Sequence, residues 1–151
     1  MKVIHGDLIK LALEGEFDVI VHGCNCFCTM GAGIAKQVKK MFPQAYDVDQ
    51  KTTRGDKNKL GTISIASITQ SENNLTIVNG YTQYNWRGSG ILVDYGAVQS
   101  VFKQIKSTFP GKRIGYPKIG AGLAKGDWEV ISDIIDVALE GEDHMLVEYS
   151  P

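Results

Sequence analysis

Short apolar runs separated by polar segments give the chain the pattern of alternating strands and helices. Phe17 to His22 is apolar almost throughout and rich in Val and Ile, as expected of a strand buried on both faces. Gly61 to Ile68 alternates Ile with small polar residues, which predicts a half-exposed strand. The predicted strands are Lys2 to His5, Phe17 to His22, Gly61 to Ile68, Leu75 to Tyr81, Arg113 to Tyr116 and Met145 to Tyr149.

Other segments repeat their apolar residues at helical spacing. The clearest is Asp94 to Phe109, where Asp94 is a predicted N-cap and Pro110 follows the end. Asp127 is the predicted N-cap of the last helix. The predicted helices are Asp7 to Leu13, Ile34 to Phe42, Ala45 to Lys51, Asp94 to Phe109 and Trp128 to Leu139.

Strands that alternate with helices predict a single α/β layered domain, residues 1–151, with a mixed central sheet. Ser71 to Asn74 is a predicted turn that joins two strands into a hairpin. Arg54 to Lys59 and Thr82 to Gly90 are predicted loops.

Composition limits the classes of partner. The formal net charge of -1 gives no global positive field for nucleic acid, so a phosphate would have to be held by local backbone geometry. No apolar run reaches the length of a membrane span, and no signal peptide is recognisable. We therefore expect a cytoplasmic protein with no membrane partner. We also expect a monomer, because the sequence shows no long exposed apolar stripe that could form an interface.

Three cysteines, Cys24, Cys26 and Cys28, follow His22 at intervals of two residues. An odd number in a chain of this kind argues against a disulfide scaffold. Structural zinc sites pair a C-x2-C motif with a second, distant pair, which this sequence lacks. Reduced thiols are the favoured interpretation, and we expect neither a metal nor another cofactor.

A glycine-rich hexapeptide occurs twice with one conservative change. It is Gly-Ala-Gly-Ile-Ala-Lys at Gly31 to Lys36 and Gly-Ala-Gly-Leu-Ala-Lys at Gly120 to Lys125. Backbone N–H groups in such loops can form concave anion sites, which a helix N-terminus strengthens. Both copies lie between a predicted strand and a predicted helix, so they could close on one phosphate-bearing ligand from two sides. A tight turn explains Gly31 to Gly33 alone equally well, and Lys36 stands where a dinucleotide fingerprint has its third glycine.

Two polar residues follow predicted strands. Asn25 could hold a ribose hydroxyl as donor and acceptor, or form an Asx-turn. Asp7 is first of all a helix N-cap, although its carboxylate could accept a hydrogen bond from an adenine amino group.

These motifs, in this order, resemble the macrodomain family, whose members bind ADP-ribose. The matching residues are Gly6-Asp7-Leu8-Ile9, His22-Gly-Cys-Asn25-Cys, Met30-Gly-Ala-Gly-Ile-Ala and Pro117-Lys-Ile-Gly-Ala-Gly-Leu, which together extend over nearly the whole chain. The resemblance implies a three-layer α/β/α fold. It is greatest for the branch that contains ADP-ribose 1″-phosphate phosphatases and ADP-ribose deglycosylases.

The resemblance also implies roles for individual residues. Asp7, assisted by the backbone of Leu8, would recognise adenine, and Tyr149 would lie against the adenine ring. Without the resemblance, a core or edge aromatic is the favoured interpretation of Tyr149. Asn25 would bind the distal ribose. The first loop would line that ribose and a phosphate, and the second loop would surround the diphosphate; these residues are Gly31, Ala32, Gly33, Ile34, Gly120, Ala121, Gly122 and Leu123.

Catalytic roles fall on His22 and Asp127. The phosphatase branch has a histidine in the motif that matches His22, and a histidine can act as acid, base or nucleophile; a structural histidine is the competing interpretation. Asp127 could orient or deprotonate water, or only cap a helix.

Hydrolysis of ADP-ribose 1″-phosphate is thus the leading function. The alternatives are a non-catalytic reader of ADP-ribosyl groups and a glycosidase that removes ADP-ribose from protein or nucleic acid. Gln83 stands where the deglycosylase branch has a lysine. That branch also has an aspartate in the second loop, at a position that falls near Ala124 in this chain. Both differences weaken a lysine-dependent mechanism. Arg87 could meet a terminal phosphate, but a solvated loop arginine is the favoured interpretation.

Overall fold

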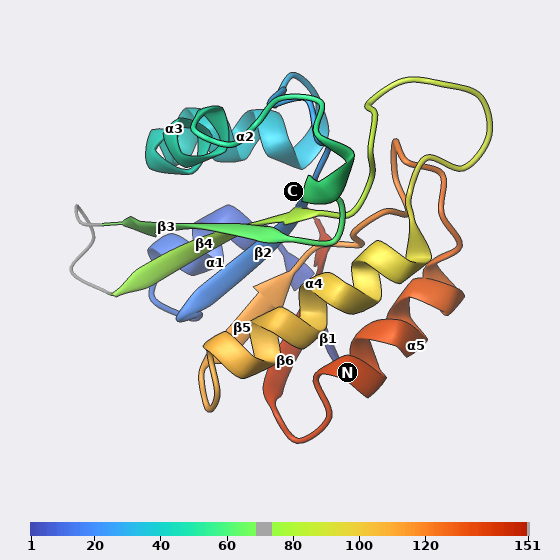
Figure 1. Cartoon of the computed structure of the whole chain (residues 1–151). Coiled ribbons are helices and arrows are strands. Elements are labelled where there is room, and N and C mark those ends of the chain that lie inside the picture. Colours follow the sequence, from blue (N-terminus) through green and yellow to red (C-terminus); the bar gives the residue numbers. More distant parts are fainter. Residues whose placement is uncertain (69–73, 151) are drawn as a thin grey trace.

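A computed structural model describes residues 1–68 and 74–150 and shows strands and helices in the predicted alternation (Figure 1). The strands are β1 (Lys2–Gly6), β2 (Val19–Cys24), β3 (Ile63–Ile68), β4 (Leu75–Tyr81), β5 (Arg113–Tyr116) and β6 (Asp143–Tyr149). The helices are α1 (Leu8–Leu13), α2 (Gly33–Met41), α3 (Pro43–Gln50), α4 (Tyr95–Thr108) and α5 (Trp128–Ala138), with a 3-10 turn η1 (Lys57–Lys59). The η1 turn corrects part of the loop predicted at Arg54 to Lys59; the carboxylate of Asp56 caps it by accepting from Asn58 N–H at 2.9 Å.

The six strands form one mixed sheet in the order β1-β6-β5-β2-β4-β3. All neighbouring pairs are parallel except β3 and β4, which pair antiparallel with Ile68 opposite Leu75. The predicted hairpin and mixed sheet are confirmed, whereas most of the turn predicted at Ser71 to Asn74 lies outside the described residues.

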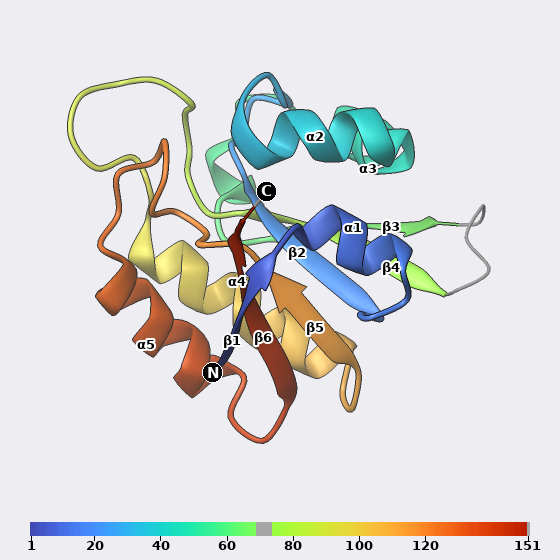
Figure 2. The same ribbon diagram turned by 180° about the vertical axis from the view of Figure 1, so that it is seen from behind.

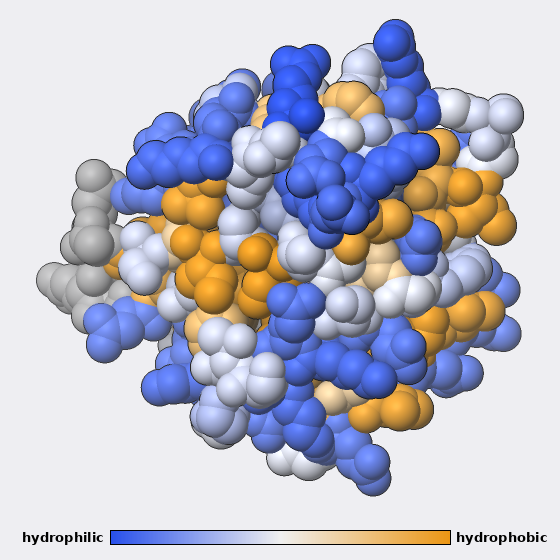
Figure 3. All heavy atoms as spheres, in the orientation of Figure 1, coloured by the Kyte–Doolittle hydropathy of each residue, from blue (hydrophilic) through white to orange (hydrophobic). Residues whose placement is uncertain are grey.

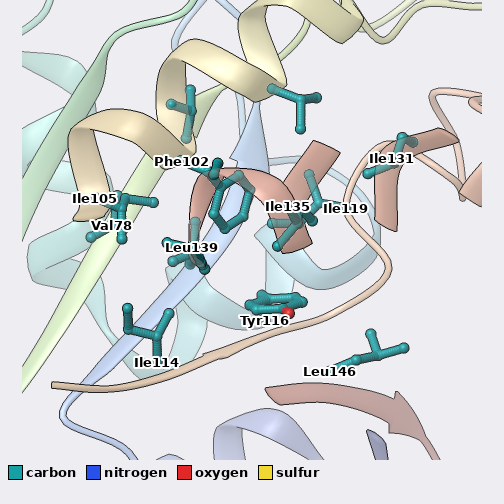
Figure 4. Packing of buried hydrophobic residues seen from close by; sticks show 14 of the residues in the cluster. Val78, Phe102, Ile105, Ile114, Tyr116, Ile119, Ile131, Ile135, Leu139 and Leu146 are labelled. Atoms are coloured by element: carbon teal, nitrogen blue, oxygen red, sulfur yellow. The ribbon is translucent and has the colours of Figure 1, made fainter. Parts of the chain in front are cut away.

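Helices cover both faces of the sheet, which confirms the three-layer architecture (Figures 1 and 2). One face of β2 carries Val19 and Val21 into a core with α4 and α5, and the opposite face carries Ile20 into a core with α1, α2 and α3. Figure 4 shows the first core, in which Phe102 of α4 and Ile135 of α5 pack above Tyr116 of β5. Buried area of this kind is the main stabilising contribution in such a layered domain.

Three helices begin at the aspartates that the sequence predicts as N-caps. Asp7 accepts hydrogen bonds from Ile9 N–H and Lys10 N–H, and Asp94 accepts from Ala97 N–H. Asp127 accepts from Glu129 N–H at 2.9 Å. Each carboxylate satisfies donors of a first helical turn, which fixes where α1, α4 and α5 start relative to the strands before them.

The face of the molecule in Figure 3 is largely hydrophilic, and its hydrophobic areas are separate from one another. No helix of the described residues is both long enough and apolar enough to cross a membrane.

Candidate functional site

A cavity of about 520 Å³ lies where the central parallel strands end. The end of β2 contributes Gly23 to Asn25, and the segment after β5 contributes Pro117 to Gly120. Both glycine loops contribute as well, through Gly31 to Ile34 of the first and Gly122 and Leu123 of the second. Parallel topology therefore brings the two hexapeptides, far apart in sequence, to one cavity.

The two glycine loops approach each other across this cavity. A Cβ atom added to Gly33, whose φ is +59°, would lie 3.6 Å from Cδ1 of Leu123. Leu123 is otherwise 70% exposed, so its side chain projects from the second loop toward the first. The loops thus form two sides of one cleft, the arrangement that the repeated hexapeptide suggested.

The first loop presents a helix N-terminus to the cavity. Helix α2 begins at Gly33, and its N-cap residue Ala32 has no side chain that could accept a hydrogen bond. The helical ladder begins with Lys36 N–H donating to Ala32 O at 3.3 Å, so the N–H groups of Gly33, Ile34 and Ala35 precede it. These donors and the helix dipole favour an anion at this end of the cavity.

The second loop is a closed turn rather than a helix start. Gly126 N–H donates to Gly120 O at 2.7 Å, and Lys125 N–H donates to Gly122 O at 3.0 Å. Gly120 has a φ of +75° and lies so close to Val93 that a Cβ would come within 2.6 Å of Cγ2. Ala121 N–H already donates to Lys118 O, so this group is not available for the diphosphate contact that the family pattern assigns to the loop.

Asn25 lines the cavity and also forms an Asx-turn. Its Oδ1 accepts from Phe27 N–H at 2.8 Å, and its Nδ2 donates to Thr29 O and Thr29 Oγ1 at 3.2 and 2.7 Å. Both amide protons are therefore engaged, while Oδ1 keeps a second lone pair for a ligand donor. Both interpretations of Asn25 are compatible with this geometry.

The residues expected to recognise adenine lie together at one end of the sheet but do not line this cavity. Asp7 follows β1, and Tyr149 is paired with Gly6 at the end of β6. The carboxylate of Asp7 caps α1, Leu8 is buried in the core, and Tyr149 is 70% exposed. Their roles with adenine stay predictions.

His22 is buried beside the cavity-lining Cys24, whose Sγ lies 3.5 Å from His22 Nε2. It is 2% exposed, and its Nε2 lies 2.6 Å from Oδ1 of Asn79 on β4. Burial lowers the pKa of His22 from 6.5 to about 4, against the opposing effect of the Asn79 hydrogen bond. His22 does not line the cavity; Cys24, two residues further along the same face of β2, does. The catalytic role of His22 therefore stays a prediction.

Asp127 is also absent from the cavity lining. Its carboxylate accepts from Glu129 N–H, and its own N–H donates to the hydroxyl of Tyr95 at 3.0 Å. Asp127 thus caps α5, and its catalytic role stays a prediction.

Several residues of the cavity carried no assigned role in the sequence. Thr29, Trp86 and Lys118 line it, as does Gln83, whose Nε2 donates to Asn85 O at 2.9 Å. Arg87 stacks on the ring of Trp86 at 4.8 Å. Lys118 lies within the last of the family motifs, whereas Thr29 and Trp86 lie in loops after strands, and this position was their only signal in the sequence.

Among the described residues, no group of three or more His, Cys, Asp and Glu side chains is arranged to hold a metal ion. Burial raises the pKa of the Cys24 thiol well above its ordinary value, which favours the neutral form at the cavity wall.

Comparison with known proteins identifies relatives over the whole chain. No protein-family model matches the sequence. An uncharacterized 17.5 kDa protein of Enterobacteria phage T4 is 34% identical over an alignment of 156 residues, which covers 100% of this chain and 97% of the phage protein. The ADP-ribose 1″-phosphate phosphatase of Candida albicans is 28% identical, with 85% of this chain and 87% of that enzyme covered. The DNA ADP-ribosyl glycohydrolase of Mycobacterium tuberculosis is 25% identical over 82% of this chain, and the match spans 34% of that enzyme.

Solved structures share the fold. The macrodomain of Mycobacterium tuberculosis DarG aligns with a TM-score of 0.77 at 22% identity, covering 99% of this chain and 97% of that one. Thermosipho africanus DarTG in complex with ADP-ribose aligns with a TM-score of 0.74 at 18% identity, covering 99% of this chain and 42% of that one. Together, the macrodomain structures that share its fold and the phosphatase and glycohydrolase relatives show that the chain belongs to the macrodomain family.

Proposed function

We propose that the cavity binds ADP-ribose. The observation that carries this proposal is the junction of the two glycine loops, where the uncapped N-terminus of α2 faces the second loop across the cavity. Such a cleft suits a diphosphate, because backbone donors hold it without a net basic surface. The ADP-ribose complex of the DarTG neighbour, which has the same fold, supports this choice of ligand.

The proposed binding mode follows from the lining. The diphosphate lies between the first turn of α2 and the N–H groups of Gly122 and Leu123, and the distal ribose lies beside Asn25. Adenine extends toward the ends of β1 and β6, where Asp7 and Tyr149 are adjacent.

We further propose that the chain hydrolyses an ADP-ribose derivative, with ADP-ribose 1″-phosphate as the leading substrate. The relative from Candida albicans, which matches over 87% of its length, supports this reaction. Removal of ADP-ribose from nucleic acid is supported by the mycobacterial glycohydrolase, but Gln83 lines the cavity at the position where a lysine-dependent enzyme needs an amine.

A reader module is the second candidate, and one observation favours it. Of the described residues that line the cavity, only Cys24 and Lys118 can titrate, and Lys118 forms an ion pair with Glu148. Hydrolysis without a positioned general base would depend on backbone donors that stabilise the transition state.

Charge substitutions at Leu123 test the binding site. Leu123 is 70% exposed, so Leu123→Glu and Leu123→Lys should fold equally well. A like charge beside a diphosphate costs about 1–2 kcal/mol at a partly exposed site, so Leu123→Glu should weaken ADP-ribose binding about tenfold in calorimetric titrations. Leu123→Lys should retain the affinity. Val137→Glu on α5, at a site that is 72% exposed, is the matched control. Equal affinities in all four proteins would place the diphosphate elsewhere.

Turnover is tested separately from binding. The protein is incubated with ADP-ribose 1″-phosphate, with ADP-ribosylated DNA and with ADP-ribosylated protein, and released phosphate and ADP-ribose are measured. Phosphate release that Leu123→Glu reduces supports the phosphatase. Tight ADP-ribose binding without turnover of any substrate supports the reader and overturns both hydrolytic proposals.

A further inference from the structure

A buried lysine contacts Cys28, the residue just before the cavity-lining Thr29. Lys59, at the end of η1, is 7% exposed, and its Nζ lies 3.3 Å from Sγ of Cys28. The same Nζ donates to Cys26 O at 3.2 Å and lies 4.6 Å from the centre of the Tyr81 ring. Neither the proposed binding mode nor the proposed hydrolysis uses this pair.

Cys28 differs from the other two cysteines in its surroundings. Cys26 is fully buried and its thiol donates to Gln83 O, while Cys24 is buried at the cavity wall. Cys28 keeps 7% of its surface exposed and has the lysine ammonium beside its sulfur. The thiolate is the form of a cysteine that reacts with peroxides, and the Lys59 nitrogen lies close enough to this sulfur to react with it once it is oxidised.

The backbone at Cys28 is held in an unusual conformation by polar contacts. Its φ is +58°, a left-handed value that is uncommon for a residue other than glycine. Gln50 Nε2 donates to Cys28 O at 2.7 Å, and Sγ of Cys28 lies 3.3 Å from Asp49 O. The sulfur of Cys28 thus lies between Lys59 Nζ, Asp49 O and Thr52 Oγ1, the last at 3.4 Å.

We propose that Cys28 and Lys59 form an oxidative crosslink, a covalent S–N bond made on exposure to hydrogen peroxide. The thiolate attacks one peroxide oxygen, the O–O bond breaks, and the hydroxide that leaves takes a proton from the Lys59 ammonium, which gives Cys28 sulfenic acid, water and a neutral amine. The amine then attacks the sulfenic sulfur, the S–O bond breaks, and a second water leaves with the hydroxyl and one amine proton. Peroxide is the oxidant, and the sulfur is oxidised.

The crosslink would act on the cavity through adjacent residues. An S–N bond is much shorter than the present 3.3 Å separation, so Cys28 has to move toward Lys59. Thr29 follows Cys28 directly, lines the cavity and accepts both amide protons of Asn25. Oxidation should therefore disturb Asn25 and weaken ADP-ribose binding about fivefold, an expectation that rests on the proposed function.

Mass spectrometry of the peroxide-treated protein tests the crosslink independently of any ligand. The expected product has lost two hydrogen atoms, and a proteolytic digest contains the peptides of Cys28 and Lys59 joined to each other. Dithiothreitol should reverse the link. A disulfide gives the same intact mass, so the joined peptides decide between them. Joined cysteine peptides, or oxygen addition at Cys28 without a link, would overturn the proposal.

Variants supply the controls. Cys26→Ser should crosslink like the parent protein, and Cys28→Ser should not crosslink. Lys59→Arg keeps the cation but has no nucleophilic amine, so its Cys28 should stop at the sulfenic acid, which dimedone labels. If Lys59→Arg fails to fold, the two cysteine variants still decide. A crosslink that forms while ADP-ribose affinity stays unchanged would refute only the coupling to the cavity.

Discussion

Replacement of His22 by glutamine separates a structural role for this residue from a catalytic one. The ring is buried, and its Nε2 lies 2.6 Å from Oδ1 of Asn79. Glutamine can donate its amide N–H to the same oxygen, so His22→Gln should fold with one hydrogen bond preserved. Unlike histidine, glutamine does not titrate, and the two proteins should therefore respond differently to acid.

The magnitude follows from the pKa of His22, which burial lowers from 6.5 to about 4 in the folded protein. Between these values the unfolded chain binds a proton that the folded protein does not, so stability falls as the pH falls. The stability that the neutral His22 contributes is fully present above pH 6.5 and is lost by about pH 4. At about 1.4 kcal/mol per pKa unit the loss amounts to about 3 kcal/mol.

Urea unfolding of both proteins at several pH values between 7.5 and 4 measures this contribution. Carboxylates and the other histidines titrate in both proteins, so their effects cancel in the difference between the two free energies of unfolding. Relative to His22→Gln, the parent protein should lose about 3 kcal/mol of its free energy of unfolding between pH 6.5 and pH 4. A difference that stays constant would refute the buried, neutral state of His22. In parallel, phosphate release that is lost in His22→Gln, with ADP-ribose affinity retained, would support the catalytic role.

Further predictions concern the second loop and the cap of α5. Gly120→Ala should lower the free energy of unfolding by about 2–5 kcal/mol, because Gly120 has a φ of +75° and an added Cβ would lie 2.6 Å from Val93. Gly122→Ala, where an added Cβ meets nothing within 4 Å, should unfold like the parent protein in urea. Asp127→Ala should cost about 1 kcal/mol through the lost cap but leave ADP-ribose affinity unchanged in calorimetry. A large loss of ADP-ribose affinity in Asp127→Ala would indicate that Asp127 contacts the ligand.

The sequence predicts the fold well where apolar spacing and chemistry agree. The run at Phe17 to His22 has the composition of a buried strand, and β2 occupies Val19–Cys24. The offset has a physical reason, because the ring of Phe17 packs against Gly115, where an added Cβ would lie 2.9 Å from it. The local apolar pattern indicates that Phe17 is buried, but it does not indicate whether Phe17 belongs to the strand or to the loop before it.

The site was less predictable, because it depends on which face of a strand a side chain occupies. His22 and Cys24 share a face of β2, yet only Cys24 reaches the cavity at the end of the strand. The partner of His22 is Asn79, 57 residues away on a neighbouring strand, which no local motif indicates. Motif matching therefore finds the loops that line the cavity, whereas the histidine to which it assigns catalysis is not part of the lining.

The two hexapeptides show how far nearly identical local sequences can diverge in structure. In the first copy the left-handed residue is the second glycine, Gly33, and α2 starts there. In the second copy Gly120 and Lys125 are left-handed, and α5 starts only at Trp128. Almost the same six residues thus form a helix N-terminus in one place and a closed turn in the other. The surroundings decide, since Gly120 is forced against Val93 whereas Gly31 has open space beside it. Both copies lack bulky side chains at the point where their backbones approach the cavity. The need for small residues at this point explains the repeated sequence, although the two copies have different conformations.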